Sequence, residues 1–200
     1  MKNNSIIIVS GEPKSIFLEI FFKSIKNKKY KSPLILICDK KILIDQMKKN
    51  KFKRKLNIIN FNQIDECKLH KNFINLIDVK FNRNNLNKYL NDSFDLAFKL
   101  IKKKFSYKLI HGPINKSTFF NKKFLGITEF ISKKFKCQNT GMLIYNKNLS
   151  VCPLTTHLPI KLVAKNISKK LIEDKIQLTN KFFKETLKYS PKIGLTSLNP

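Results

Sequence analysis

The chain has 200 residues, of which 42% are hydrophobic and 17 are phenylalanine, enough apolar surface for one good-sized domain or two small lobes and too much for a disordered chain. The formal net charge is +28, but only Arg54 and Arg83 are arginines and the lysines are spread along the whole chain. A nucleic-acid interface more often gathers cations on one element with aromatic residues for stacking, so we expect no specific nucleic-acid partner.

The four cysteines include no closely spaced pair, so the sequence predicts neither a zinc ribbon nor a redox motif. No signal peptide is evident at the start, and no apolar run approaches the length that spans a bilayer. We therefore expect a cytoplasmic protein that has no membrane partner.

Short apolar runs alternate with longer amphipathic stretches, a pattern typical of strands joined by crossover helices in an α/β fold. Ser15 and Asp39 are the expected caps of the first two helices. Helical spacing assigns the inner face of the first helix to Ile16, Phe17, Ile20, Phe21 and Ile25, and that of the third to Leu86, Leu90, Phe94, Ala97 and Ile101. In chain order, we expect strands at 6–9, 34–38, 56–61, 73–79 and 107–110, and helices at about 16–25, 40–50 and 86–104.

The second half of the sequence contains fewer patterns typical of strands. A helix is expected at 129–135, a hairpin of strands 142–145 and 149–154, a helix after Pro159, a helix at about 171–189 and the start of a strand at 193–198. Because no linker rich in Pro, Gly or Ser interrupts the chain, a boundary must lie in a short connection, which we place near residue 105. This division gives a first α/β lobe, 1–105, and a second, incomplete α/β lobe, 106–200, that carries the metal and substrate loops.

The few glycines exclude several common sites. With only five glycines, the sequence contains neither a GxGxxG fingerprint nor a GxxxxGK[ST] phosphate loop. It also lacks the GxSxG motif of serine hydrolases and the HExxH motif of zinc proteases. Four loops remain that follow strands or open helices, where ligands of α/β proteins collect: 11–13 (GEP), 112–116 (GPINK), 126–129 (GITE) and 155–159 (TTHLP).

Three residues in these loops could carry chemistry. His157, at a predicted strand end, could bind a first-row metal, or its ring could simply be satisfied by a backbone carbonyl. Thr128, in the first turn of a helix, could hold an anion or act as an ordinary cap. Lys116 could meet a phosphate or remain a solvated lysine.

Taken in order, five segments resemble the 4-hydroxythreonine-4-phosphate dehydrogenase family: GEPKSIFLEI at 11–20, GPINK at 112–116, GITEF at 126–130, TTHLPIK at 155–161 and LNP at 198–200. The resemblance implies a three-layer α/β/α fold like that of isocitrate and isopropylmalate dehydrogenases, a homodimer, and NAD bound without a Rossmann fingerprint. It also implies NAD-dependent oxidation of 4-hydroxythreonine 4-phosphate, followed by decarboxylation, in the biosynthesis of pyridoxal 5'-phosphate (vitamin B6).

The same resemblance implies a divalent metal (Zn, Mg or Co) that three histidines hold and that acts as a Lewis acid on the substrate's oxygen. By position, His157 would be the first of these ligands and Thr128 would contact the substrate. Lys116 is the second candidate substrate contact. We assign no catalytic residue and no NAD-binding residue.

The sequence departs from the family pattern at several positions. Ile127 stands where the family has a substrate-contacting histidine, and Ser15, Phe17 and Leu18 replace Gly, Gly and Pro of the first motif. The chain also ends at Pro200, where the next family residue would be the second metal-binding histidine, so we expect an N-terminal portion that is not a complete catalyst. Two alternatives stay open: a sister dehydrogenase of four-carbon sugar-acid phosphates, and a degenerate, non-catalytic binding module.

Overall fold

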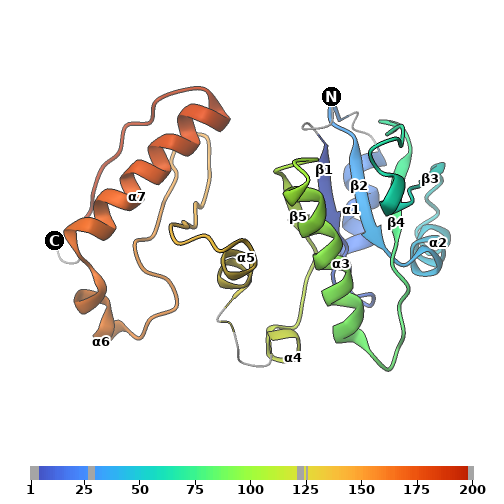
Figure 1. The fold of residues 1–200 in the computed structure, drawn as a ribbon, viewed down its shortest axis with the longest axis horizontal. Helices are drawn as coiled ribbons and strands as arrows, with labels where there is room; N and C mark the ends of the chain where they lie inside the picture. The colour runs from blue at the N-terminus through green and yellow to red at the C-terminus, as the bar shows by residue number, and fades with distance from the viewer. Residues whose placement is uncertain (1–4, 27–29, 121–123, 125, 198–200) are drawn as a thin grey trace. The chain divides into compact units, whose positions relative to one another are not determined.

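The computed structural model describes residues 5–26, 30–120, 124 and 126–197 (Figure 1). The chain divides into two compact units, Met1–Asn121 and Lys122–Pro200. The sequence placed a boundary near residue 105, but the strand that follows that position pairs with the first strand of the chain and so lies in the first unit.

The first unit contains a five-stranded, fully parallel sheet with the strand order β3-β4-β2-β1-β5. This arrangement confirms the predicted α/β class. The last residues of neighbouring strands are in register, for example Val9 with Ile37 and with His111, so the loops that follow these strands emerge at one edge of the sheet. The strands are β1 (Ile6–Val9), β2 (Leu34–Cys38), β3 (Leu56–Ile58), β4 (Ile74–Asp78) and β5 (Leu109–His111).

Helices cover both faces of this sheet, which confirms three layers for the first unit. Successive strand residues point to opposite faces. On one face, Ile8 and Leu36 pack in a buried cluster with side chains from α1 (Phe17–Lys26) and α2 (Lys40–Lys49). Helix α3 (Leu86–Lys102) contacts β1 and β2 and lies in front of the sheet in Figure 1, with α1 behind it.

The inner face of α1 differs from the prediction. Ile16 and Ile20 were assigned to the core but are 66% and 53% exposed. Apolar residues occupy a wide arc of this helix, so their spacing alone does not fix which part of the arc faces the core. Ser15, the expected cap, donates its hydroxyl to the carbonyl of Glu12 at 2.7 Å, and its oxygen lies 3.5 Å from the amide of Phe17. The side chains that α1 buries are Leu18, Phe21, Phe22 and Ile25.

The predicted cap of α2 is confirmed. Asp39 is buried, and its Oδ1 accepts a hydrogen bond from the amide of Ile42 at 2.9 Å. In α3 the predicted residues Leu90, Phe94 and Ala97 are fully buried. Both elements therefore follow from local capping and periodicity.

The second unit consists of helices and extended segments, and its described residues contain no strand. The predicted hairpin is reduced to one antiparallel bridge between Ile144 and Val151, with N···O distances of 2.8 and 3.0 Å, because a two-stranded ribbon without further strands is only marginally stable. Residues 193–197 are also irregular, and 198–200, which carry the LNP segment, lie outside the described residues. The helices are α5 (Ile127–Phe135), α6 (Ile160–Val163), η3 (Ala164–Asn166), α7 (Lys169–Phe182) and η4 (Phe183–Leu187).

Two short helices complete the first unit, η2 (Phe61–Gln63) and α4 (Lys116–Phe120). The prediction extended the third strand to residue 61, but β3 ends at Ile58 and η2 begins at Phe61. Among the described residues, none of the helices is both long and apolar enough to cross a bilayer.

Candidate functional site

The GEP and GPINK loops meet in the first unit because β1 and β5 are parallel neighbours. The amide of Gly112 donates to the carbonyl of Val9 at 2.8 Å, and the amide of Glu12 donates to the carbonyl of Pro113 at 2.9 Å. The carboxylate of Glu12 in turn accepts the amide of Asn115 at 2.5 Å. Two segments about a hundred residues apart in the sequence thus form one connected pair of loops.

Both glycines of this loop pair are required by close packing. Gly11 has φ +72°, and a Cβ added there would lie 2.4 Å from the carbonyl oxygen of Pro113. A Cβ on Gly112 would lie 2.1 Å from the carbonyl oxygen of Ser10. The adjoining Lys116 is the exposed first residue of α4.

A buried polar cluster lies beneath the same edge of the sheet. The hydroxyls of Ser10 and Tyr89 share a hydrogen bond of 3.0 Å, and Cys38 and Asp39 are buried at the end of β2. Burial raises the pKa of the Cys38 thiol and of the Tyr89 hydroxyl, so both groups stay neutral near pH 7. Asp39 also accepts the amide of Phe81 at 2.9 Å. These groups stabilise the edge of the sheet and offer no activated nucleophile.

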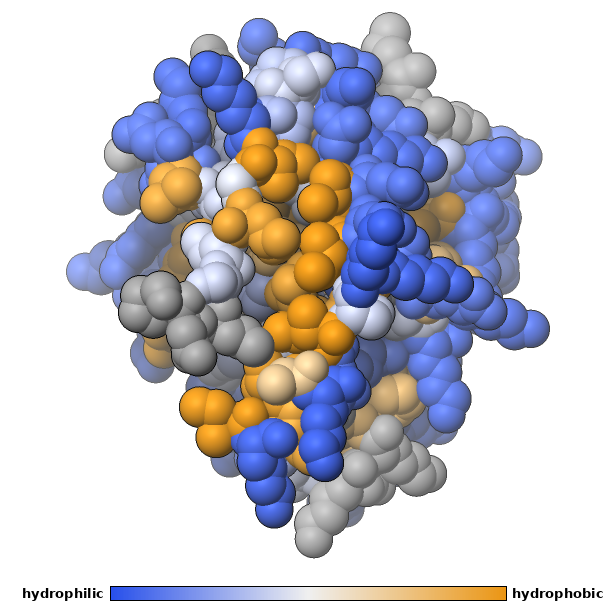
Figure 2. All heavy atoms as spheres, turned by 90° about the vertical axis from the view of Figure 1, so that its left-hand side faces the viewer, coloured by the Kyte–Doolittle hydropathy of each residue, from blue (hydrophilic) through white to orange (hydrophobic). Residues whose placement is uncertain are grey.

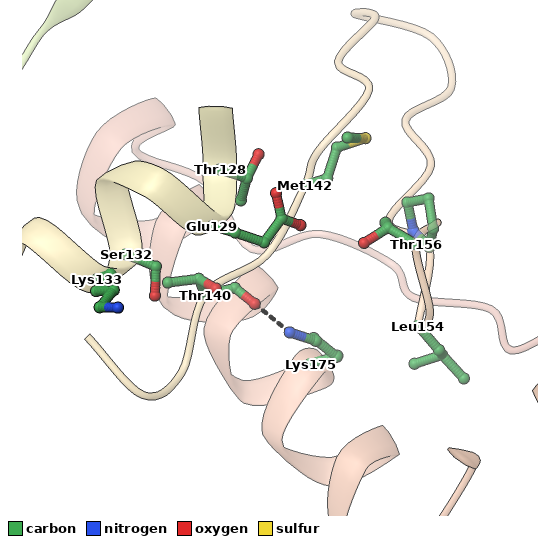
Figure 3. Close-up of a pocket in the computed structure, with 10 residues that line it drawn as sticks. Thr128, Glu129, Ser132, Lys133, Thr140, Met142, Leu154, Thr156 and Lys175 are labelled. Atoms are coloured by element: carbon green, nitrogen blue, oxygen red, sulfur yellow. Dashed lines mark hydrogen bonds between the residues drawn. The ribbon is translucent and has the colours of Figure 1, made fainter. Parts of the chain in front are cut away.

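The second unit holds a cavity of about 300 Å³, shown in Figure 3. Its walls include residues of two of the predicted loops, the GITE segment on α5 and the TTHLP segment, together with a lysine from α7. The volume is at the lower end of the range for small-molecule sites. The lining residues are Thr128, Glu129, Ser132, Lys133, Thr140, Met142, Pro153, Leu154, Thr156 and Lys175.

Helix α5 presents its first turn to this cavity. Gly126 is the N-cap in an extended conformation, and no side chain caps the helix. Thr128 is therefore not the cap of α5, so the interpretation of this residue as an ordinary cap is wrong. Its side chain lines the cavity. The backbone amides of this turn also carry partial positive charge at the helix N-terminus, which suits an anionic ligand.

The cavity contains charged groups of both signs. Lys175 is half-buried and donates a hydrogen bond to the carbonyl of Thr140, and Lys133 is exposed at the end of α5. Glu129 is the anionic residue of the lining, and its Oε2 is buried without a hydrogen-bond partner in the described structure. The sequence did not single out Glu129, although it belongs to the GITE segment.

His157 lies next to this cavity but is not among its lining residues. Its side chain is exposed, and its Nε2 lies 3.8 Å from the position that a Cβ on Gly126 would occupy. Within the described part of the chain the ring forms no hydrogen bond, so the interpretation in which a backbone carbonyl satisfies it is not realised.

The backbone of His157 is strained, with φ +58°. Such a conformation costs on the order of 1 kcal/mol or more in a residue other than glycine, and it is concentrated at functional sites. The other described non-glycine residues with positive φ follow helix ends, where this conformation is common: Lys51, Lys104, Lys136 and Lys188. His157 therefore differs from them in lying within a loop.

The three predicted site residues fall in different units. Thr128 and His157 both belong to the second unit, whereas Lys116 belongs to the first. In the described ranges, no three His, Cys, Asp or Glu side chains come together as a possible metal site.

The family model of the "Pyridoxal phosphate biosynthetic protein PdxA" matches residues 29–200. The chain belongs to the PdxA family. The resemblance that the five segments indicated is thereby confirmed.

Named relatives agree with this assignment. The 4-hydroxythreonine-4-phosphate dehydrogenase of Wigglesworthia glossinidia brevipalpis is 30% identical over 211 residues, covering 100% of this chain and 63% of the relative. The enzyme of the same name from Aquifex aeolicus is 30% identical over 209 residues, covering 99% of this chain and 63% of the relative. The chain thus spans about 63% of the length of these curated PdxA relatives.

Solved structures share the fold. The crystal structure of 4-hydroxythreonine-4-phosphate dehydrogenase from Klebsiella pneumoniae matches with a TM-score of 0.76 at 20% identity, over 91% of this chain and 60% of the other. That of the enzyme from Burkholderia phymatum matches with a TM-score of 0.75 at 18% identity, over 90% of this chain and 58% of the other. At these identities the match supports a PdxA-like fold and nothing finer.

Proposed function

We propose that this protein acts as a 4-hydroxythreonine-4-phosphate dehydrogenase in pyridoxal 5'-phosphate biosynthesis in the cytoplasm. It would oxidise the substrate's hydroxyl with NAD, and decarboxylation would follow. The observation that carries the proposal is the cavity of the second unit, to which two separate family segments, GITE and TTHLP, both contribute lining residues. The names of the 30%-identical relatives support the choice of reaction.

The charges of the cavity match those of the proposed substrate. At pH 7, 4-hydroxythreonine 4-phosphate carries an anionic phosphate, a carboxylate and an ammonium group. Lys133, Lys175 and the first-turn amides of α5 would attract the anionic groups, while Glu129 would face a cation. We keep Lys116 as a proposed phosphate contact from the first unit.

A divalent metal is part of the proposal, with His157 as one ligand. The exposed imidazole, free of hydrogen bonds in the described structure, suits that role, and an imidazole ligand favours Zn over Mg among the candidates Zn, Mg and Co. The described residues do not form a complete ligand set, so they fit a metal only in part and we derive no catalytic step through it. NAD is likewise proposed without assigned contacts.

We also propose that the protein works as a homodimer. Figure 2, which faces the second unit, shows apolar side chains gathered in a band. Exposed apolar side chains that gather in this way are typical of an interaction surface, and a second copy is the partner that the family resemblance implies. A monomer in sedimentation equilibrium at micromolar concentration would contradict this proposal. The exposed apolar residues of this unit include Ile144, Leu149, Val151, Ile160, Leu162, Ile176 and Phe182.

Ile127 supports a second candidate function, the oxidation of a four-carbon sugar-acid phosphate. It is the first residue of α5 and directly precedes Thr128, which lines the cavity. Because the side chain of isoleucine has no hydrogen-bond donor or acceptor, a hydrogen bond that a histidine side chain makes to the substrate at this position is lost. A change of substrate within the same reaction type would follow.

The test measures NADH formation by the absorbance at 340 nm. The full-length protein is assayed with each substrate in turn and with added Zn, Mg or Co. Turnover of 4-hydroxythreonine 4-phosphate that a chelator abolishes is the expected result. Turnover of the sugar-acid phosphate alone would select the second function, and no turnover of either substrate with any metal would favour the non-catalytic module. His157→Ala should abolish activity, whereas His70→Ala, in the first unit, is the matched control.

A further inference from the structure

The first unit carries an open hollow, of about 790 Å³, that has an apolar floor and a cationic rim. It lies where α2 ends and where β3, the edge strand of the sheet, begins. The proposed reaction does not use this surface, which we call the basic hollow. Its apolar lining residues are partly buried: Ile44, Met47, Phe52 and Leu56. Its cations are Lys48, Lys51, Lys53, Lys55 and the half-buried Arg54.

The fold holds the apolar floor of the basic hollow in place. Met47, Phe52 and Leu56 pack against the buried cluster that α1 and α2 form with the sheet. The ring of Phe52 stacks on that of Phe22, with centroids 4.7 Å apart and an angle of 13° between the planes. The amide of Phe52 also donates to the carbonyl of Met47 at 2.9 Å, after Lys51 turns the chain with φ 49°. Because the floor is preformed, a ligand loses little affinity to ordering it.

The cations of the rim have no acidic partners. Six of the eight residues at 48–55 are Lys or Arg, and no Asp or Glu occurs between Asp45 and Asp65. In the described part of the chain, none of the five cations that line the basic hollow forms an ion pair. Positive charges gathered in this way repel one another and attract an anionic ligand.

The floor and the rim together restrict the ligand. Five cations call for several negative charges, more than the head group of one fatty acid supplies. A second copy of this chain has the same net charge of +28 and is repelled. Single-stranded nucleic acid binds by stacking bases on aromatic rings, but Phe52 is the one aromatic residue of the described lining, and Phe22 covers a face of its ring. A flat anionic membrane would meet the rim and leave the recessed floor empty.

We propose that the basic hollow binds an acidic peptide segment of another protein, one in which apolar side chains stand between Glu or Asp residues. The apolar side chains would displace water from the floor. The carboxylates would pair with the Lys and Arg side chains of the rim. The basic hollow belongs to the first unit and the candidate substrate cavity to the second, so this proposal does not depend on the proposed function.

The experiment titrates the full-length protein into fluorescein-labelled peptides and follows their anisotropy. The probe is a peptide of Glu-Glu-Leu repeats. The control peptide has Ser in place of every Leu, so that both peptides carry the same charge. The Leu peptide should bind about 10- to 100-fold more tightly, the range expected for burying one leucine side chain.

Two double variants locate the electrostatic part of the binding. Lys53→Gln with Arg54→Gln removes two cations of the rim, whereas Arg83→Gln with Lys88→Gln removes the same charges from exposed positions elsewhere in the first unit. The rim variant should weaken binding of the Leu peptide about 3- to 30-fold, the range for two exposed ion pairs. The control variant should change it less than about twofold, because salt screens distant charges.

Two single variants locate the apolar part. Ile44 lines the basic hollow from α2, so Ile44→Gln should reduce the preference for the Leu peptide over the Ser peptide. Ile20 is 53% exposed on α1 and lies outside the lining, so Ile20→Gln should leave this preference unchanged.

Equal affinity of the wild-type protein for the Leu and Ser peptides would overturn the proposal, because bulk charge alone would then explain the binding. This comparison stands even if a variant fails to fold. The absence of binding, or equal weakening by the two double variants, would overturn the proposal as well. Tighter binding of oligo-dT or of phosphatidylglycerol vesicles than of the Leu peptide, lost in the rim variant, would assign the basic hollow to nucleic acid or to a membrane instead.

Discussion

Gly112→Ala tests whether the loops after β1 and β5 pack as closely as the structure shows. The new Cβ would lie 2.1 Å from the carbonyl oxygen and 2.7 Å from the carbonyl carbon of Ser10, and 2.9 Å from Cγ of Phe17. Ordinary contacts lie at 3.4–4 Å, so the overlap with the Ser10 carbonyl exceeds an ångström. Two of the three atoms belong to the backbone and do not rotate away, so β1 and β5 must separate.

The expected cost is at the upper end of overpacking effects, about 3 kcal/mol. With a urea m-value of about 2 kcal/mol/M, the unfolding midpoint measured by far-UV circular dichroism should fall by about 1.5 M. Gly194→Ala is the matched control, because nothing lies within 4 Å of the Cβ it would add. It should change the free energy of unfolding by less than about 0.5 kcal/mol. A Gly112 variant as stable as wild type would refute the close approach of these loops.

Three further predictions concern the edge of the sheet. Asp39→Ala removes the cap of α2 and the acceptor for the amide of Phe81. The free energy of unfolding, measured in the same urea titration, should fall by about 2–3 kcal/mol. A loss below about 0.5 kcal/mol would contradict these hydrogen bonds. At pH 8, a thiol reagent should modify the exposed Cys137 in the folded protein and reach the buried Cys38 only after unfolding, so early labelling of Cys38 would argue against its burial. Burial raises the pKa of Cys38 and Tyr89 above their ordinary values of 9.0 and 10.0, so the unfolded chain loses these protons first and stability should decline as pH rises above about 9. A urea midpoint that stays constant from about pH 8 to 10.5 would contradict this linkage.

Part of the candidate site could be predicted because its signals are local. The GITE and TTHLP segments were recognised from consecutive residues, and both contribute to the cavity of the second unit. The positions of Glu129 and Lys175 in the cavity wall were not predicted, since a glutamate or a lysine in a sequence does not reveal which side chains will surround it. Glu129 differs from an ordinary helix residue only because the fold buries one of its oxygens without a donor.

The sequence by itself determined the elements whose cause lies within a few residues. β1 and β2 occupy their predicted residues, and Asp39 caps α2, because an apolar run and a capping side chain act over short distances. The α/β class followed from the alternation of such elements.

Tertiary structure alone decided which surfaces of these elements meet. The apolar residues of α1 allowed several inner faces, and packing against β1, β2 and β4 chose the one with Phe21 and Phe22. The same holds for Gly112. A side chain at this position is excluded only because β5 lies beside β1. It also explains the missing hairpin at Ile144 and Val151, since strands persist where a sheet pairs and covers them, and the second unit provides no such sheet within its described residues.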